Sequence, residues 1–242
     1  MLKADRHLFT FALTVCVVVS ALLSTAATLL KDRQDLMVEL DRKRNVLSAF
    51  GLDIYDEDGR RLGVEAVDKI FADNIREVIL DGQTGELLEG LTSADLDPRE
   101  LRDKQKLLLY KWEEDGEFTR FAFPISGLGL WSTIYGYLAL DQDLATILGV
   151  TFYDHGETPG LGAEIERDWW QEQFEGKKLY ADGEPADFRV IKGGVSRRYP
   201  DGHPSAVDGL SGATVTGEGV ARFINADFRR YNRYFETIRE GG

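Results

Sequence analysis

Cysteine and histidine are scarce in this chain of 242 residues. The single cysteine, Cys16, lies in an apolar N-terminal stretch, and the histidines are scattered at His7, His155 and His203. The absence of thiols after residue 16 excludes disulfides, cysteine-ligated zinc or iron–sulfur clusters and a catalytic thiol from that part of the chain. Since the histidines show no metal-ligand spacing either, we expect no metal site.

Positive charge is also in deficit, with 29 Lys and Arg against 42 Asp and Glu and a net charge of -13. Nucleic-acid binding depends on cationic contacts with phosphates, so this balance indicates no nucleic-acid partner. The length is sufficient for one large domain or two small ones with a buried core.

One long hydrophobic run is present, from Leu8 to Leu30, without a charged residue. As a helix these residues would span roughly 35 Å, enough to cross a hydrocarbon layer of about 30 Å. We predict a transmembrane anchor, although Lys3, Arg6 and the small residues at 24–27 also suit a cleaved signal peptide. Two cations precede the run and five follow it within residues 31–44, a bias opposite to that of an exported domain, so charge leaves the membrane side open.

The remaining periodicities predict an α+β fold with a mostly antiparallel sheet and flanking helices. Helical patterns cover residues 34–50, 66–75 and 163–174 and an amphipathic segment after residue 214, and strand patterns cover residues 78–80, 106–112, 118–124, 133–140, 146–152 and 188–191. The acidic turn 113–117 predicts a hairpin. We divide the chain into an anchor (1–33), a membrane-proximal helix with an α/β segment (34–105) and a ligand-binding domain (106–242).

Three glycine-rich loops, at residues 126–132, 154–162 and 208–217, are the candidate binding segments. The third precedes a helix face formed by Val220, Ile224, Phe228, Tyr231 and Phe235. Small residues permit close backbone approach, and free N–H groups at a helix start favour an anion such as phosphate. On local spacing alone, an ordinary capped helix start is the simpler interpretation of that loop.

Several catalytic classes fit poorly. Ser211 lacks the glycine spacing of a nucleophile elbow, no Gly-Lys-Ser or Gly-Lys-Thr occurs, and Gly160 and Gly162 lack the third glycine of a dinucleotide motif. Loops that combine glycine, hydroxyls and aromatics suit a planar, phosphorylated cofactor. A membrane-anchored binding module and a secreted hydrolase that uses Ser211 are the alternatives from other functional classes.

The loop Asp208-Gly-Leu-Ser-Gly-Ala-Thr214 resembles the flavinylation motif Asp-x-x-Ser/Thr-Gly-Ala-Thr. The segments 155–162 and 127–132, the latter with 135–137, resemble two further signatures of the same family. With one N-terminal anchor, the chain resembles the C subunit of the sodium-translocating NADH:quinone oxidoreductases over nearly its whole length. The related G subunit of Rnf complexes is the alternative, and the Leu-Trp-Ser and Tyr-Gly-Tyr sequences favour the quinone-reductase family.

This resemblance implies that FMN is covalently bound to Thr214 through a phosphoester. It implies an electron relay, not catalytic alone, among the other subunits of a sodium pump in the bacterial inner membrane. A flavin transferase that recognises Asp208 would attach the cofactor. The single-pass chain would place its C-terminal domain in the periplasm.

Further cofactor-binding candidates come from the three motifs. Hydroxyls for the phosphate or ribityl chain are Ser211, Thr216 and Thr158, and candidates for ring contact are Leu161, Trp131 and Tyr135, for which core packing is the alternative. We also predict that Gly212, Ala213 and Glu157 contact the cofactor. His155 suits either flavin contact or the capping of its loop.

Overall fold

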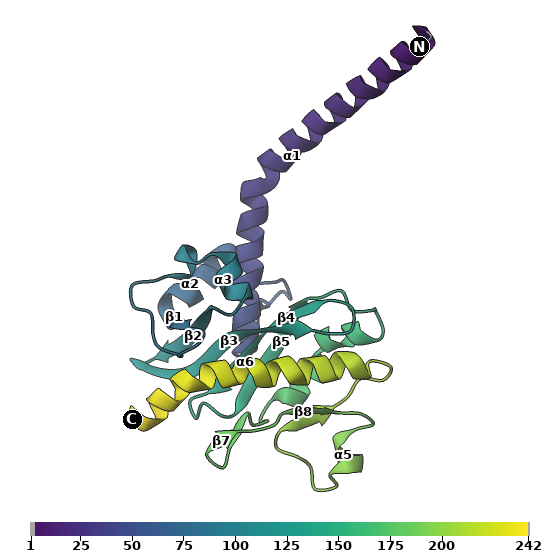
Figure 1. Cartoon of the computed structure of the whole chain (residues 1–242). Coiled ribbons are helices and arrows are strands. Elements are labelled where there is room, and N and C mark those ends of the chain that lie inside the picture. The colour runs from purple at the N-terminus through teal and green to yellow at the C-terminus, as the bar shows by residue number, and fades with distance from the viewer. Residues whose placement is uncertain (1–2, 242) are drawn as a thin grey trace. The chain divides into compact units, whose positions relative to one another are not determined.

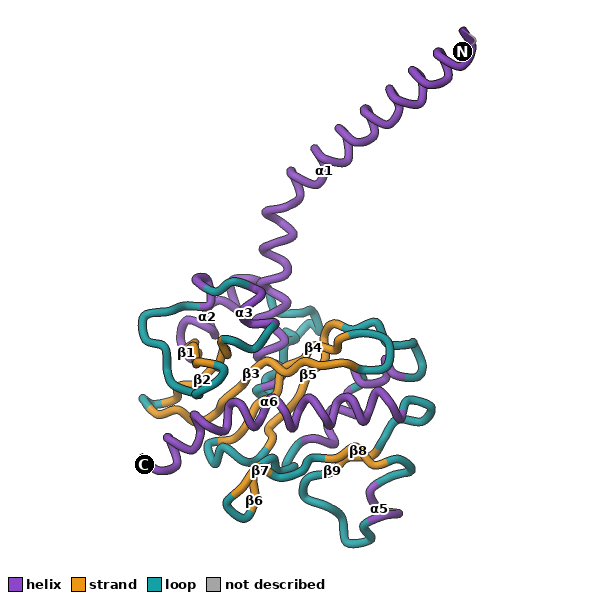
Figure 2. Tube along the Cα trace, viewed as in Figure 1, coloured by secondary structure: helices purple, strands orange, loops and turns teal. Residues whose placement is uncertain are grey.

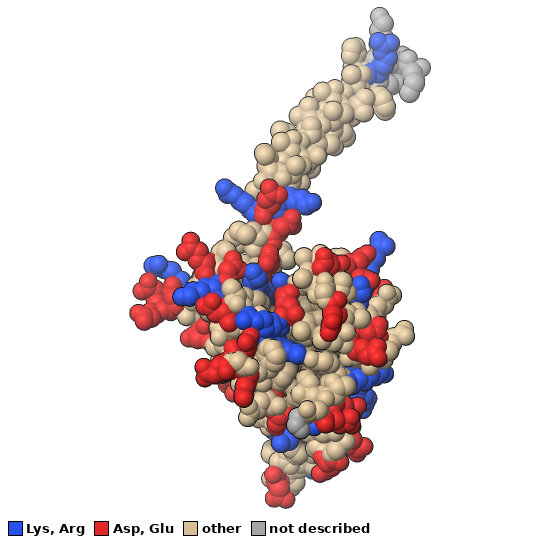
Figure 3. All heavy atoms as spheres, turned by 90° about the vertical axis from the view of Figure 1, so that its left-hand side faces the viewer, with Lys and Arg blue, Asp and Glu red and all other residues tan. Residues whose placement is uncertain are grey.

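The structure, a computed structural model, describes residues 3–241 and forms two compact units, Met1–Arg42 and Lys43–Gly242. Helix α1 (Lys3–Ala49) carries the apolar run, whose surface shows no charge in Figure 3 before charges of both signs follow. Its part Arg6–Ala49 is long and apolar enough to cross a membrane, and none of its most apolar window is buried. A single-pass anchor is consistent with these properties.

The second unit is built on a five-stranded antiparallel sheet (Figures 1 and 2). The strands follow one another in chain order: β1 (Ile75–Asp81), β2 (Lys106–Glu114), β3 (Glu117–Leu128), β4 (Thr133–Asp141) and β5 (Ile147–Asp154). The predicted α+β fold and antiparallel sheet are confirmed. The β2–β3 hairpin turns at Asp115 and Gly116, which have φ values of 52° and 84°, the positive values of a two-residue hairpin turn.

Helices cover both faces of the sheet. One face packs against α6 (Thr214–Gly241), whose apolar stripe Val220, Phe223, Ile224, Phe228, Tyr231 and Phe235 is buried with Phe121, Phe123 and Ile125 of β3. On the other face, α2 (Val64–Asn74) contributes Phe71, and the residue that follows α1 contributes Phe50. Phe50 contacts Trp112 at 5.6 Å between ring centroids. A sheet covered on both sides gives its edge loops a rigid support.

The short elements complete the fold. They are η1 (Ser93–Asp95), α3 (Pro98–Arg102), η2 (Gly162–Glu166), α4 (Asp168–Gln171), η3 (Glu172–Phe174), β6 (Tyr180–Ala181), β7 (Glu184–Pro185), β8 (Arg189–Ile191), α5 (Val195–Arg198) and β9 (Ala206–Asp208). Strands β8 and β9 pair in parallel. Because β9 ends at Asp208, the chain enters the third glycine-rich loop directly from a strand.

One helix was expected over residues 163–174, and the structure has three short turns there instead. Arg167 is extended (φ -78°, ψ 135°) and resets the helix direction between η2 and α4. Ile165, Trp170 and Phe174 are all buried as a result. Their spacing of five and four residues does not place them on one face of a continuous helix, so the burial of all three side chains accounts for the interruption of the helix at Arg167.

Candidate functional site

Thr214 is the half-buried first residue of α6. The first bond of the helical pattern runs from the Gly217 N–H to the Ala213 carbonyl at 3.0 Å. The N–H groups of Thr214, Val215 and Thr216 therefore have no acceptor within the helix. Together with the helix dipole, they create a favourable place for an anion.

Asp208 fixes the loop that leads to Thr214. Its carboxylate accepts a 2.6 Å hydrogen bond from the Val195 N–H at the start of α5. Its backbone N–H donates to Gln173, and its carbonyl accepts from the Trp170 indole at 2.8 Å. Four residues on, Gly212 has a φ of 75°, a left-handed conformation that favours glycine. The loop is thus held at its beginning and turned sharply before the helix.

The carboxylate of Glu157 joins the three glycine-rich loops. Its Oε1 accepts hydrogen bonds from the N–H groups of Leu130 and Trp131 at 3.0 and 2.9 Å. Its Oε2 accepts from the Thr216 hydroxyl at 2.6 Å. We call these four residues the Glu157 clamp. The side chains of Glu157 and Thr216, both candidates for ligand contact, therefore hold the site together from inside.

Hydrogen bonding keeps this buried carboxylate ionised. Burial by itself raises the pKa of Glu157, which is only 5% exposed. The Thr216 hydroxyl and the backbone N–H groups of Trp131, Ser132 and Leu130 outweigh burial, and the net pKa of Glu157 lies below its ordinary value. The clamp is therefore a negative charge stabilised by the loops that it connects.

Glycines make this close packing possible. A Cβ atom at Gly129 or at Gly162 would lie 2.6 Å from an oxygen of Glu157, and one at Gly212 would lie 2.8 Å from Leu161 Cδ2. Real Cβ atoms essentially never approach other atoms so closely. The glycine spacing that marked the three loops in the sequence therefore reflects their contact with one another.

Exposed apolar side chains surround the start of α6. They are Leu128, Leu130, Trp131, Leu161 and Val215, of which Trp131 is 70% exposed. We call this set the apolar rim. Apolar groups gathered at exposed positions often mark a ligand or partner site. A helix start that favours phosphate beside an apolar rim that suits a flat ring fits both parts of FMN.

The other predicted residues take different places. The His155 side chain is 6% exposed, with its Nδ1 accepting the Glu157 N–H at 3.2 Å and its Nε2 3.0 Å from Glu166 Oε1, an arrangement that caps its loop. Tyr135 lies two residues before Tyr137 on β4, so both side chains point to the same face of the sheet, the face away from α6. Thr158 and Ser211 are exposed, and Ala213 is buried.

Sequence reasoning did not single out Leu128, Leu130 or Val215. Each is an apolar residue in or beside a glycine-rich loop, and such residues are core residues in most loops of this kind. Only the exposed fraction of the side chain distinguishes them, and it depends on contacts distant in sequence.

Comparison with known proteins defines the class of this domain. The FMN-binding domain family matches residues 129–227, which include the Glu157 clamp and Thr214. The predicted cofactor, FMN, is thus confirmed.

The chain belongs to the family formed by the C subunits of the Na(+)-translocating NADH-quinone reductases, as the three motifs predicted. It is 36% identical to that subunit of Yersinia pestis, over 94% of this chain and 90% of the relative. It is 34% identical to the same subunit of Pseudomonas aeruginosa, over 95% of this chain and 94% of the relative. The crystal structure of Shewanella oneidensis NqrC superposes with a TM-score of 0.70 and 29% identity, covering 83% of this chain and 97% of the other.

Proposed function

We propose that this chain is an FMN-carrying electron-transfer subunit of a sodium-pumping NADH:quinone reductase, with the FMN phosphate esterified to Thr214 Oγ1. The observation that carries the proposal is the position of Thr214, the first residue of α6, where three glycine-rich loops converge. Membership in the C-subunit family supports the assignment to this complex.

Different residues of the site would hold the phosphate and the ring of the cofactor. Thr214 supplies the ester oxygen, and the first N–H groups of α6 stabilise the negative phosphate. The apolar rim offers contact for the ring and shields it partly from water. When bound, FMN supplies reversible uptake and release of electrons, and the protein sets its position and surroundings.

The site has no evident machinery for bond-breaking chemistry. Glu157 is committed to three hydrogen bonds inside the clamp, and His155 caps its own loop. The exposed rim leaves one side of the site open to a partner. These features support a relay that receives electrons from one redox centre and passes them to another.

The decisive experiment is the intact mass of the full chain produced together with a flavin transferase. We expect wild-type protein to gain the mass of FMN less one water and Thr214→Ala to remain unmodified. Thr158→Ala, which removes an exposed hydroxyl of the same site outside the flavinylation motif, should still be modified. An adduct that survives Thr214→Ala would refute the attachment.

We further propose that the folded domain lies in the periplasm and that a separate flavin transferase modifies it there. Helix Arg6–Ala49, which is long and apolar enough to cross a membrane, is compatible with this placement. A single thiol at exposed residue 57, from Glu57→Cys in a Cys16→Ser background, should react with a membrane-impermeant maleimide in intact spheroplasts. Labelling only after membrane disruption would place the domain on the other side.

A further inference from the structure

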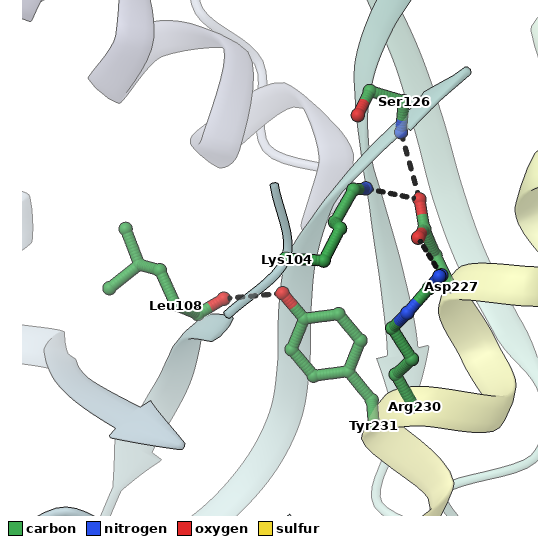
Figure 4. A network of polar contacts seen from close by, with 6 residues as sticks. All are labelled: Lys104, Leu108, Ser126, Asp227, Arg230 and Tyr231. Atoms are coloured by element: carbon green, nitrogen blue, oxygen red, sulfur yellow. Dashed lines mark hydrogen bonds and ion pairs between the residues drawn. The ribbon is translucent and has the colours of Figure 1, made fainter. Parts of the chain in front are cut away.

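Asp227 is a buried charge that the proposed electron relay does not use. It lies on α6 and is 1% exposed. Its Oδ2 is 2.7 Å from Lys104 Nζ and accepts the Ser126 N–H at 2.9 Å, while its Oδ1 accepts from Arg230 at 3.0 Å (Figure 4). A charge so deeply buried requires such partners, and one of them is the backbone of β3.

That backbone contact lies where two neighbouring strands separate. Strands β2 and β3 pair from the hairpin only as far as Tyr110 and Ala122. Beyond this point, β3 pairs with β4 alone within the described residues. On the edge so opened, Pro124 has no N–H group, and the N–H of Ser126 bonds to Asp227.

Side chains of α6 form hydrogen bonds with both β2 and β3 where these two strands no longer pair with each other. The Tyr231 hydroxyl donates to the Leu108 carbonyl of β2 at 3.0 Å, one turn from Asp227 (Figure 4). The two side chains therefore satisfy one backbone group on each separated strand. This arrangement allows β3 to separate from β2 and to continue, paired with β4, into the first glycine-rich loop while the Ser126 N–H and the Leu108 carbonyl keep hydrogen-bond partners.

From Ser126 onward, β3 follows α6 toward the helix start. A Cβ at Gly127 would clash with Phe223, and one at Gly219 would lie 2.5 Å from the Leu128 carbonyl. Leu130 and Trp131 then meet the Glu157 clamp, which ends on Thr216. The strand end is thus anchored to α6 by polar groups at two places, Asp227 and Thr216, about three helical turns apart.

We propose that Asp227 is a positioning residue, whose bond to Ser126 sets the register of the first glycine-rich loop on α6 and so the geometry between Thr214 and Trp131. The inference rests on the proposed attachment of FMN to Thr214, because that residue and the loop carry the two halves of the site. Lys104 reaches Asp227 from a left-handed backbone with φ 56°, uncommon for a residue other than glycine.

Two substitutions separate the position of the acceptor from its charge. Asp227→Asn keeps an oxygen at the right distance for the Ser126 N–H but removes the charge. Asp227→Glu keeps the charge but moves the carboxylate by one methylene. Arg230→Gln removes a half-exposed cation and leaves the bond to Ser126 in place. Val67→Ala, in the buried face of α2, controls for a general loss of stability.

The primary measurement is amide hydrogen exchange of residues 126–132 in the unmodified full chain in detergent. We expect about tenfold faster exchange in Asp227→Glu, the scale of one lost hydrogen bond, and near wild-type exchange in Asp227→Asn and Arg230→Gln. The same order should hold for the visible circular dichroism of the flavin in modified protein.

Faster exchange of residues 126–132 in Asp227→Asn together with wild-type exchange in Asp227→Glu would overturn the proposal. Equal exchange in all variants, or a rise in Val67→Ala as large as that in Asp227→Glu, would overturn it as well. If Asp227→Glu fails to fold, faster exchange of residues 126–132 in Asp227→Asn is by itself sufficient to overturn the proposal. A wild-type chain that gains no FMN on Thr214 would refute the proposed attachment, and the exchange of the unmodified chain would still test the register.

Discussion

The Thr216 hydroxyl donates a 2.6 Å hydrogen bond to Glu157, joining the first turn of α6 to the second glycine-rich loop. Both side chains are buried, and Thr214 lies two residues earlier on the same turn. Through the other oxygen of Glu157, this contact extends to the N–H groups of Leu130 and Trp131. One carboxylate therefore connects the helix turn that carries Thr214, the proposed attachment residue, to the loop that carries Trp131, the most exposed ring of the site.

Thr216→Val keeps the shape of the side chain and removes the donor to Glu157. We expect a loss of about 1–3 kcal/mol in the free energy of unfolding, because a buried acceptor loses its partner. Chemical unfolding of the full chain in detergent, followed by tryptophan fluorescence, measures this loss. The matched control is Thr119→Val, since the buried Thr119 hydroxyl has no partner within the described residues and its removal should cost little.

Glu157→Gln should change how stability depends on pH. The folded state lowers the pKa of Glu157 below its ordinary value near 4.5. The stabilisation is therefore complete above that value and is lost as the pH falls through the lower pKa of the folded state. We expect wild type to be more stable than the variant at pH 7 and the difference to shrink in acid. A difference that stays constant down to pH 3 would contradict an ionised clamp.

Gly129→Ala should disrupt the clamp by steric conflict with Glu157 Oε1. Forced overpacking of this kind costs typically about 1–3 kcal/mol. Gly63→Ala is the control, because Gly63 has open space around it and only caps α2, where alanine should cost less than about 1 kcal/mol. Unfolding midpoints of the two variants give the comparison, and equal midpoints would show that the loop accommodates a methyl group.

Trp131→Ala should alter the surroundings of the flavin and leave its attachment intact. We expect the FMN mass to be retained and the flavin fluorescence to rise, because the variant removes the indole that we propose contacts the ring. Trp169→Ala removes another exposed indole, 53% exposed, from a helix outside the apolar rim and should leave the fluorescence unchanged. Identical spectra in both variants would place Trp131 away from the flavin.

Gly116→Ala should weaken the β2–β3 hairpin without touching the site. Gly116 has a φ of 84° and no neighbour that a Cβ would meet, so only the left-handed backbone is penalised, by roughly 1–2 kcal/mol. Asp115→Asn is the control, since asparagine tolerates this conformation. Thermal unfolding measures both, and an unchanged midpoint in Gly116→Ala would show that the turn adjusts.

Local patterns in the sequence predicted much of the fold. The apolar run, the hairpin at residues 113–117 and the strands after it follow from periodicity and turn chemistry. The three-residue strand β9 was not predicted, because so short a segment shows no period and forms only by pairing with β8. The extension of β3 to Leu128 was missed for a similar reason, since glycines favour a loop unless a neighbouring strand holds them.

The glycine-rich loops were predictable, but the tasks of their polar residues were not. Glu157 was predicted only as a cofactor contact, and its hydrogen-bond partners, which lie 26, 27 and 59 residues away in the chain, were not predicted. Asp227 is one acidic residue in an amphipathic helix, and its bond to Ser126 spans 101 residues. Contacts at such separations leave no local signal, so only the folded arrangement shows which carboxylates support the site from within.

Helix α6 follows all five strands of the sheet in the chain, and this order has a consequence for biosynthesis. About sixty residues separate the end of β5 from Thr214, so the ribosome releases the complete sheet well before the helix that covers it. Until then, the apolar face formed by Phe121, Phe123 and their neighbours lacks its helix and is open to water. A flavin transferase that recognises the assembled loops would find its target only after this last cover closes, so cofactor attachment would report that folding is complete.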